Sequence, residues 1–344
     1  MLRLINILIL FIVSAATAAA STGTAGDFDC RWMSHPTPDD TSHVWFSRTI
    51  VTSEKDMPRA AYIRVATTGR FVLYVNGRNV STALFTPDRQ KGDTAVAAIA
   101  YDVQRFLRTD TNTIALLYCP SMRTHRQVSV CFYGIAADSS HFAVSGTDRP
   151  CFALNGNAGW LCRQADTWQT HDGGEAMNRN LYPYRWTDAN QPLALWQAVE
   201  ETSTSQPLNT TPPQPLTTTT PHHLTTINTL SSEDICGYSP LRINPLVDNA
   251  ARISRIYTPL LTEQSGDTLT VHLVPNRRHL IRVTLRGCRR GERIRIGNLQ
   301  YVCTGEMDEQ AFTRFSPTDQ NTVTISGDRH FCCEQVQEVE SICL

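Results

Sequence analysis

The sequence predicts an all-β fold made of two β-sandwich domains, and three observations support this prediction. In the stretch Phe71–Gly77, successive side chains point to opposite faces of an extended chain, with Val72 and Tyr74 on one of them. Asn76-Gly77 ends this stretch, and both residues tolerate the positive φ of a two-residue hairpin turn. A second region of alternating apolar residues occupies 253–344, and no long segment of the sequence has the 3.6-residue period of an amphipathic helix.

The length and composition of the chain fit two domains. A chain of 344 residues is long enough for two hydrophobic cores, and 41% of its residues are hydrophobic. A Thr/Pro-rich stretch without a period at 201–235 predicts a linker between a first domain at 28–200 and a second domain at 236–344. The net charge is −1 at pH 7, so no basic excess of the kind that binds nucleic acid is present.

Residues 1–20 have the pattern of a cleaved signal peptide. Arg3 gives a positive start, Leu4–Val13 is a short apolar run, and Ala15–Ala20 offers small residues for cleavage. The alternative is a retained N-terminal anchor, although the apolar run is short for a membrane span. We expect a secreted or periplasmic protein that has no membrane span after signal cleavage.

Alternating or continuous apolar runs predict the strands, and Gly, Pro, Asn or Asp residues separate them. In the first domain, 103–107 forms a single helical turn, and Asp102 caps its start by accepting backbone N–H bonds. In the second domain, Gly297-Asn298 makes a turn between two strands. The run 95–100 is apolar and leads into Tyr101-Asp102. The predicted strands are 44–51, 60–66, 71–75, 112–117, 128–135 and 142–144, followed by 269–274, 280–286, 292–296, 299–303, 321–325 and 332–344.

The chain contains eleven Cys, which is an odd number, so at least one thiol is unpaired or pairs between chains. Cys288 and Cys303 flank a predicted hairpin and could face each other, as could Cys151 and Cys162 across a Gly/Asn-rich turn. Plain buried thiols are the alternative, because several Cys alternate with apolar residues. No His lies at zinc-ligand spacing from two Cys, so the sequence predicts neither a metal site nor a cofactor.

An aromatic, loop-rich segment gives the candidate site. Glu175 follows two glycines, and four aromatic residues lie close to it in the sequence: Trp168, Tyr182, Tyr184 and Trp186. Aromatic rings with nearby polar groups suit carbohydrates, because a sugar ring packs on an aromatic face while its hydroxyls form hydrogen bonds. The alternative is that these aromatics pack a long loop onto the sandwich.

No residue is predicted to be catalytic. Glycoside hydrolysis needs two carboxylates across a sugar, and Glu306 and Asp308 would share one face of a strand. This spacing is common, so we expect these carboxylates, with Glu309, to cap turns or to bind Arg314 instead. The sequence contains no Gly-x-Ser-x-Gly elbow and no Gly-rich phosphate loop.

Several segments together resemble bacterial α-L-rhamnosidases, which are glycoside hydrolases. The segments of the first domain are Trp45-Phe-Ser-Arg48, Leu73-Tyr-Val-Asn-Gly77, Thr86-Pro87, Tyr101-Asp-Val103, Asn112-Thr-Ile-Ala-Leu116, Asp166-Thr-Trp168 and Trp196-Gln-Ala198. Leu285-Arg-Gly287 with Gly291-Glu292 is similar to the β-sandwich that follows in that family. The resemblance covers most of 40–344 and implies a jelly-roll, galactose-binding-like architecture.

The same resemblance implies that catalysis belongs to acidic residues of a helical α/α-toroid that follows these sandwiches. The second predicted sandwich finishes at Leu344, the last residue of the sequence, so no catalytic motif carries over. We therefore expect an exported, non-catalytic protein that binds carbohydrate, such as a rhamnose-containing glycan, or supports a partner glycoside hydrolase. The alternatives are a truncated or split α-L-rhamnosidase and a surface structural or assembly protein.

Overall fold

The structure, a computed structural model, describes residues 32–37, 39, 41–67, 69–88, 97–120, 126–145, 159–184, 186, 195–202, 226–229 and 250–344. These residues form strands and short 3-10 turns, so the all-β prediction is confirmed. Within these ranges, no helix is long and apolar enough to cross a membrane. The signal-peptide range 1–20, Cys151 and most of the predicted linker lie outside the described residues.

The first sandwich packs one complete sheet against part of a larger one. Both sheets turn apolar side chains inward around Phe46, Ile63, Leu73 and Val130, all nearly or fully buried. The complete sheet has the order β13 (Glu200–Thr202), β1 (Trp32–Ser34), β8 (Val128–Ile135), β3 (Ala60–Thr67), β6 (Ala97–Asp102) and β14 (Thr226–Thr229), and β9 (His141–Ser145) pairs with β8. The larger sheet contributes β12 (Gln197–Ala198), β10 (Leu161–Gln169), β2 (Ser42–Val51), β7 (Thr111–Cys119), β4 (Arg70–Val75) and β5 (Arg78–Asn79).

The second sandwich repeats this plan on a smaller scale. Its core gathers buried residues such as Val283, Ile294, Tyr301 and Ile325 between two sheets. One sheet contains β15 (Arg255–Tyr257), β23 (Val336–Cys343), β18 (His279–Arg286) and β21 (Asp308–Phe312). The other consists of β16 (Leu261–Ser265), β17 (Thr268–His272), β22 (Thr322–Gly327), β19 (Arg293–Ile296) and β20 (Leu299–Val302).

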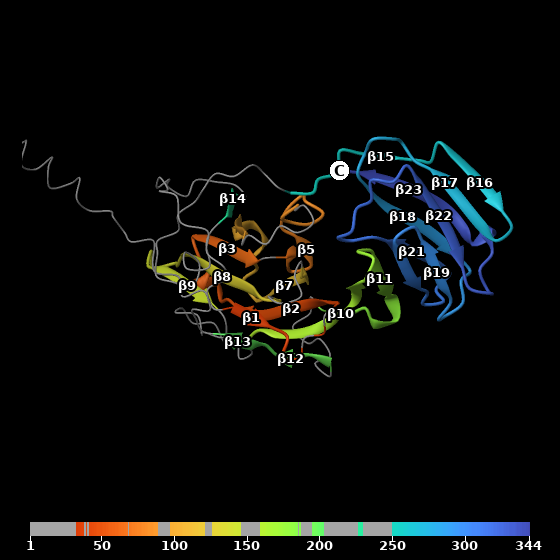
Figure 1. The fold of residues 1–344 in the computed structure, drawn as a ribbon. Coiled ribbons are helices and arrows are strands. Elements are labelled where there is room, and N and C mark those ends of the chain that lie inside the picture. The colour runs from red at the N-terminus through yellow and green to blue at the C-terminus, as the bar shows by residue number, and fades with distance from the viewer. Residues whose placement is uncertain are drawn as a thin grey trace, which may run out of the picture.

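One sheet is shared by the two sandwiches, and β11 (Glu175–Asn178) is the strand that joins them. It pairs antiparallel with β10 of the first sandwich and parallel with β20 of the second. A twelve-stranded sheet therefore extends through both domains, and in Figure 1 green β10 runs from the first sandwich toward β11, which lies beside the blue second sandwich. Two sandwiches joined only by a linker would be expected to move relative to each other, whereas a shared sheet holds their orientation.

The hairpin and turn predictions are confirmed. Asn76 and Gly77 have φ values of 52° and 77° between β4 and β5. The Asn76 side chain also accepts from the backbone N of Thr113 at 2.9 Å, so it fixes the hairpin against β7. Gln104 N donates to the carboxylate of Asp102 at 3.0 Å, as predicted for the start of η2 (Gln104–Phe106). The other 3-10 turns are η1 (Glu54–Asp56), η3 (Arg179–Leu181) and η5 (Cys333–Gln335).

Cys288 and Cys303 lie against each other at the base of the β19–β20 hairpin. Both side chains are buried, and their thiols are in hydrogen-bond contact. The structure describes them as free thiols, so the predicted proximity is confirmed and the cysteines pack as small apolar groups.

A buried histidine makes the stability of the fold dependent on pH. His43 on β2 is fully buried, with Nδ1 2.8 Å from the Thr167 hydroxyl and its ring edge against Phe315. Burial, together with the positive charges of Arg314 and Arg126, lowers the pKa of His43 from 6.5 to about 3. The folded state therefore keeps His43 neutral where the unfolded chain binds a proton.

We expect the free energy of unfolding to decrease as the pH falls from about 6.5 toward about 3, because protons then bind preferentially to the unfolded chain. His43 contributes a slope of at most roughly 1.4 kcal/mol per pH unit. Urea unfolding at pH 7, 6, 5 and 4 should show a shallower slope for His43→Gln. Burial also lowers the pKa of His35 and His279, so some slope will remain. The exposed His171→Gln is the control, and equal slopes for wild type and His43→Gln would contradict the assignment.

Candidate functional site

The β10–β11 hairpin carries the first sandwich into the second, and its turn is shaped for close contact. Gly173 has a φ of 85°, a left-handed conformation that favours glycine. A Cβ on Gly174 would lie 2.1 Å from the carbonyl oxygen of Asn298, so only glycine lets the two backbones approach this closely. The backbone N of Glu175 donates to the same oxygen at 3.0 Å, which starts the pairing of β11 with β20.

Glu175 fastens the domain junction from the inside. Its side chain is fully buried, and its two carboxylate oxygens accept from the backbone N of Arg314 at 2.6 Å and of Phe315 at 2.5 Å. Burial raises the pKa of the Glu175 carboxyl, while these two donors and the Arg314 and Arg70 guanidinium groups oppose the rise. Both oxygens are engaged with the second domain, so Glu175 acts as a structural clamp between the sandwiches.

A buried ion cluster lies beside this clamp. Asp166 on β10 is fully buried and receives two bonds from Arg314, at 3.0 and 3.3 Å, and one from Arg179 at 3.2 Å. The Arg314 side chain is only 10% exposed. A buried carboxylate is tolerated when it is paired and hydrogen-bonded, so these contacts fix both arginines in place.

A cleft of about 440 Å³ opens between the two sandwiches next to this cluster. Such a volume is within the range of small-molecule sites, ~300–1,000 Å³. Its wall from the first sandwich carries Trp45, Val72, Tyr74, Gly77, Asn79, Leu84, Leu117, Arg179, Tyr182 and Trp186, and its wall from the second carries Leu280, Phe312, Thr313, Arg314 and Ile342. The lining therefore combines aromatic and aliphatic side chains with two guanidinium groups.

Four aromatic rings form one wall of the cleft. Trp186 lies 4.6 Å from Trp45 and 4.9 Å from Tyr74 between ring centroids, and its Nε1 donates to the Tyr182 hydroxyl at 3.1 Å. The Arg179 guanidinium stacks on the Tyr182 ring at 4.1 Å. Burial raises the pKa of the Tyr74 phenol, so this group remains a neutral hydroxyl at the cleft.

The structure brings together two of the five predicted site residues. Tyr182 and Trp186 line the cleft, and Trp186, 8% exposed, also packs the loop onto the sandwich as the alternative interpretation expected. Glu175 lies behind the cleft in the domain junction, and Trp168 on β10 is half-buried and lines no part of the cleft. Tyr184 is 57% exposed and also lies outside the cleft lining.

Sequence reasoning missed the residues that complete the cleft. The alternation in their strand puts Val72 and Tyr74 on one face and Phe71 and Leu73 on the other. The face of Val72 and Tyr74 lines the cleft, so the alternation was a usable signal. Arg314 gave no local signal, since its position depends on the docking of the second domain. Trp45 likewise gave no local signal, because its place in the cleft wall depends on its contact with Trp186, which is distant in the sequence.

The acidic residues near 306–309 do not bind Arg314, which corrects one expectation. Glu309 is buried and accepts from the Tyr301 hydroxyl and from the backbone N of Thr304 and Gly305, so it caps a turn as the other alternative proposed. Asp308 forms an ion pair with Arg286 at 2.6 Å. Arg314 is instead paired with Asp166, on the first sandwich.

One family model matches part of the chain. The model described as "Alpha-L-rhamnosidase N-terminal domain" matches residues 56–219. This part of the chain is therefore similar to the N-terminal domain of α-L-rhamnosidases. A search of the curated proteins finds no match for the chain.

Solved structures with a similar fold include α-L-rhamnosidases. The enzyme from Dictyoglomus thermophilum is 14% identical, with a TM-score of 0.67 over 92% of this chain and 35% of its own. The Aspergillus terreus enzyme is 13% identical, with a TM-score of 0.62 over 91% of this chain and 36% of its own. The Streptomyces avermitilis enzyme, solved with L-rhamnose, is 14% identical, with a TM-score of 0.63 over 89% of this chain and 29% of its own.

These likenesses show the fold of the chain beyond residues 56–219, because they cover about nine-tenths of it, including the second sandwich. The chain spans about a third of the length of these rhamnosidases.

We expect Glu175→Ala to destabilise the protein strongly, because it leaves the buried N–H groups of Arg314 and Phe315 without an acceptor. Each unsatisfied group costs about 1–3 kcal/mol. Urea unfolding should show this loss, while Glu200→Ala, at an exposed position on β13, should remain within about 0.5 kcal/mol of wild type. A Glu175→Ala variant as stable as the Glu200→Ala control would show that the clamp is not what holds the domains together.

Proposed function

We propose that this chain is an exported, non-catalytic accessory protein that binds carbohydrate in the cleft between its two sandwiches. The observation that carries this proposal is the composition of the cleft: aromatic and aliphatic walls combined with fixed guanidinium and phenol groups. Sugars need this combination, because one face of the ring is apolar while its edge carries hydroxyls. The similarity of residues 56–219 to the rhamnosidase N-terminal domain supports the same ligand class.

The polar groups of the cleft are held in place before a ligand arrives. The Asp166 carboxylate fixes Arg314 through two hydrogen bonds and Arg179 through one. A guanidinium has five N–H donors, so donors beyond those used at Asp166 remain for sugar hydroxyls. A side chain that is already ordered loses less conformational entropy on binding, which favours affinity.

The cleft suits a deoxy sugar such as rhamnose better than a fully hydroxylated one. Its wall from the second sandwich includes Leu280 and Ile342, and the opposite wall includes Val72, Leu84 and Leu117. These aliphatic side chains can bury a methyl group, whereas a hydroxyl there would lose its hydrogen bonds to water. We therefore propose a rhamnose-containing glycan as the ligand, which the protein would hold for a partner glycoside hydrolase.

The arrangement of carboxylates supports the non-catalytic part of the proposal. A glycosidase needs two carboxyl groups across the sugar bond. The cleft lining contains no Asp or Glu within the part of the chain that the structure describes. Asp166 and Glu175, which lie beside the cleft, are both engaged in the domain junction.

We expect Tyr182→Ala to weaken binding of a neutral oligosaccharide that ends in α-L-rhamnose. Loss of one aromatic contact should raise the dissociation constant about two- to tenfold in calorimetry. Tyr74→Phe, which removes only a hydroxyl, is a milder second variant that leaves the packing of the wall intact.

Tyr62→Ala is the matched control, because Tyr62 is a half-buried tyrosine that stacks on another tyrosine, Tyr133, and lies outside the cleft lining. Thermal unfolding of each variant separates a loss of binding from a loss of fold. Failure of wild type to bind any rhamnose-containing glycan, or an equal loss in Tyr62→Ala, would refute the cleft as the binding site.

A second candidate function is that the chain acts as part of an α-L-rhamnosidase, which its match to about a third of those enzymes favours. We expect the purified chain to release no nitrophenol from p-nitrophenyl α-L-rhamnoside, because its cleft presents no carboxylate pair. Sustained turnover by the purified chain, unaffected by repeated chromatography, would overturn the non-catalytic proposal.

A further inference from the structure

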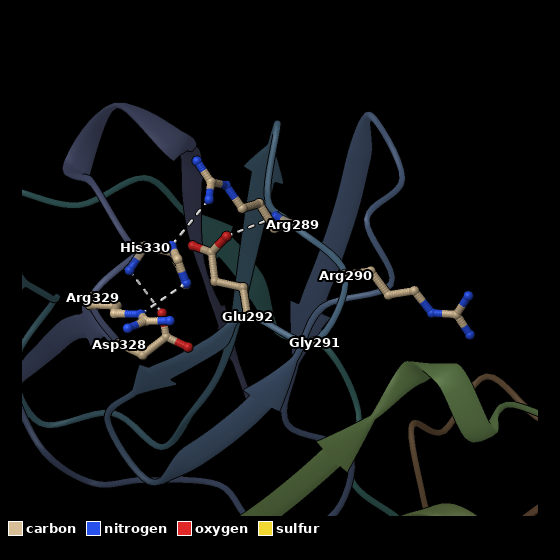
Figure 2. A pocket seen from close by; sticks show the side chains of 7 residues that line it. All are labelled: Arg289, Arg290, Gly291, Glu292, Asp328, Arg329 and His330. Carbon is tan, nitrogen blue, oxygen red and sulfur yellow. Dashed lines mark hydrogen bonds between the residues drawn. The ribbon is translucent and has the colours of Figure 1, made fainter.

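A second hollow, of about 550 Å³, lies at one end of the second sandwich and is lined by charged side chains. Two loops form it. The first connects β18 to β19 and carries Arg289, Arg290 and Glu292, and the second follows β22 and carries Arg329 and His330 (Figure 2). None of these residues belongs to the cleft between the domains.

Both loops are held rigidly by their own carboxylates. Glu292 is buried, and its Oε2 accepts from the backbone N of Arg289 at 2.8 Å and from the Gln335 amide at 3.3 Å. Asp328 accepts from the backbone N of Arg293 at 3.0 Å and of His330 at 2.9 Å. Both oxygens of Asp328 and Oε2 of Glu292 are therefore engaged, whereas Oε1 of Glu292 has no hydrogen-bond partner among the described residues.

Three arginines line the hollow. Within the described ranges, no carboxylate lies within ion-pair distance of Arg289, Arg290 or Arg329. Arg290 extends to the opposite side of its loop, away from the other two arginines (Figure 2). Its Nε donates there to the Asn180 side chain at 3.1 Å. The hollow itself is therefore faced by the guanidinium groups of Arg289 and Arg329.

His330 lies between two of these cations. Arg289 Nη1 is 3.3 Å from His330 Nδ1, and Arg329 Nε is 3.2 Å from His330 Nε2 (Figure 2). A neutral imidazole has one acceptor nitrogen, so it can accept from only one of the two guanidinium groups. At the other contact, an imidazole N–H faces a guanidinium N–H. An anion that accepts hydrogen bonds from both guanidinium groups would remove this contact between two donors.

We propose that this hollow binds the carboxylate of an acidic sugar. Arg289 and Arg329 supply forked donors that match a planar carboxylate, and the volume accommodates the ring that carries it. The choice of a sugar acid rests on the proposed carbohydrate function, and it extends that function to glycans that contain uronic acid. The hollow would then recognise the acidic residues of a chain whose neutral, rhamnose-type residues enter the cleft.

The test is calorimetry of the full chain with a galacturonic acid trimer at low and at physiological salt. We expect binding that weakens with salt, because the arginines are exposed. The double variant Arg289→Gln/Arg329→Gln should raise the dissociation constant at least about tenfold, since it removes both charged hydrogen-bond donors that face the carboxylate. Arg255→Gln/Arg295→Gln is the matched control, because it removes the same charge at exposed positions that do not line the hollow.

Inorganic phosphate and a sulfated disaccharide serve as alternative anions. Equal or tighter binding of phosphate would overturn the acidic-sugar proposal in favour of a simple anion site, and equal loss in the control pair would show a general charge effect. Absence of trimer binding to wild type would also overturn it. Neutral rhamnose-containing oligosaccharide is titrated in parallel, and its binding should be the same in the double variant. Failure of the neutral titration alone would count against the cleft, whereas failure of the trimer alone would count against this hollow.

Discussion

The parallel pairing of β11 with β20, with the Glu175 carboxylate behind it, is the interaction on which the rest of the structure depends. A buried carboxylate that accepts two backbone N–H groups has a fixed position and direction, so it sets where the second sandwich meets the first. Gly174 allows the strands to approach, because any side chain there would collide with Asn298. The orientation of the two domains is therefore a property of the shared sheet rather than of the linker.

The cleft is a consequence of this docking. Arg314 reaches its carboxylate partner, Asp166, only when the second sandwich is seated, and the aromatic wall around Trp186 belongs entirely to the first. Hydrogen bonds within the buried ion cluster hold the polar groups, while a separate apolar cluster that includes Phe85 and Phe315 fills the junction beside them. Rigid polar groups next to apolar walls are what a sugar site requires, so one set of contacts serves both stability and recognition.

Local pattern was sufficient to predict the strands but not their partners. The alternation in Phe71–Gly77 and the chemistry of Asn76-Gly77 predicted β4 and its turn, because a hairpin is decided by neighbouring residues. Glu175 was predicted to be a site residue because its carboxylate lies among aromatic residues. A carboxylate in such surroundings needs hydrogen-bond donors, and the sequence does not show that these are the backbone N–H groups of Arg314 and Phe315. Pairing over such separations depends on packing between domains, which short windows of sequence do not contain.

A glycan in the cleft between the sandwiches would be seen most directly in a crystal structure of the chain soaked with an oligosaccharide that ends in α-L-rhamnose. We expect the terminal sugar between Tyr182 and the second sandwich, with its hydroxyls within hydrogen-bond distance of Arg179 or Arg314. Electron density for the sugar at any other surface, with the cleft holding only water at saturating ligand, would contradict it.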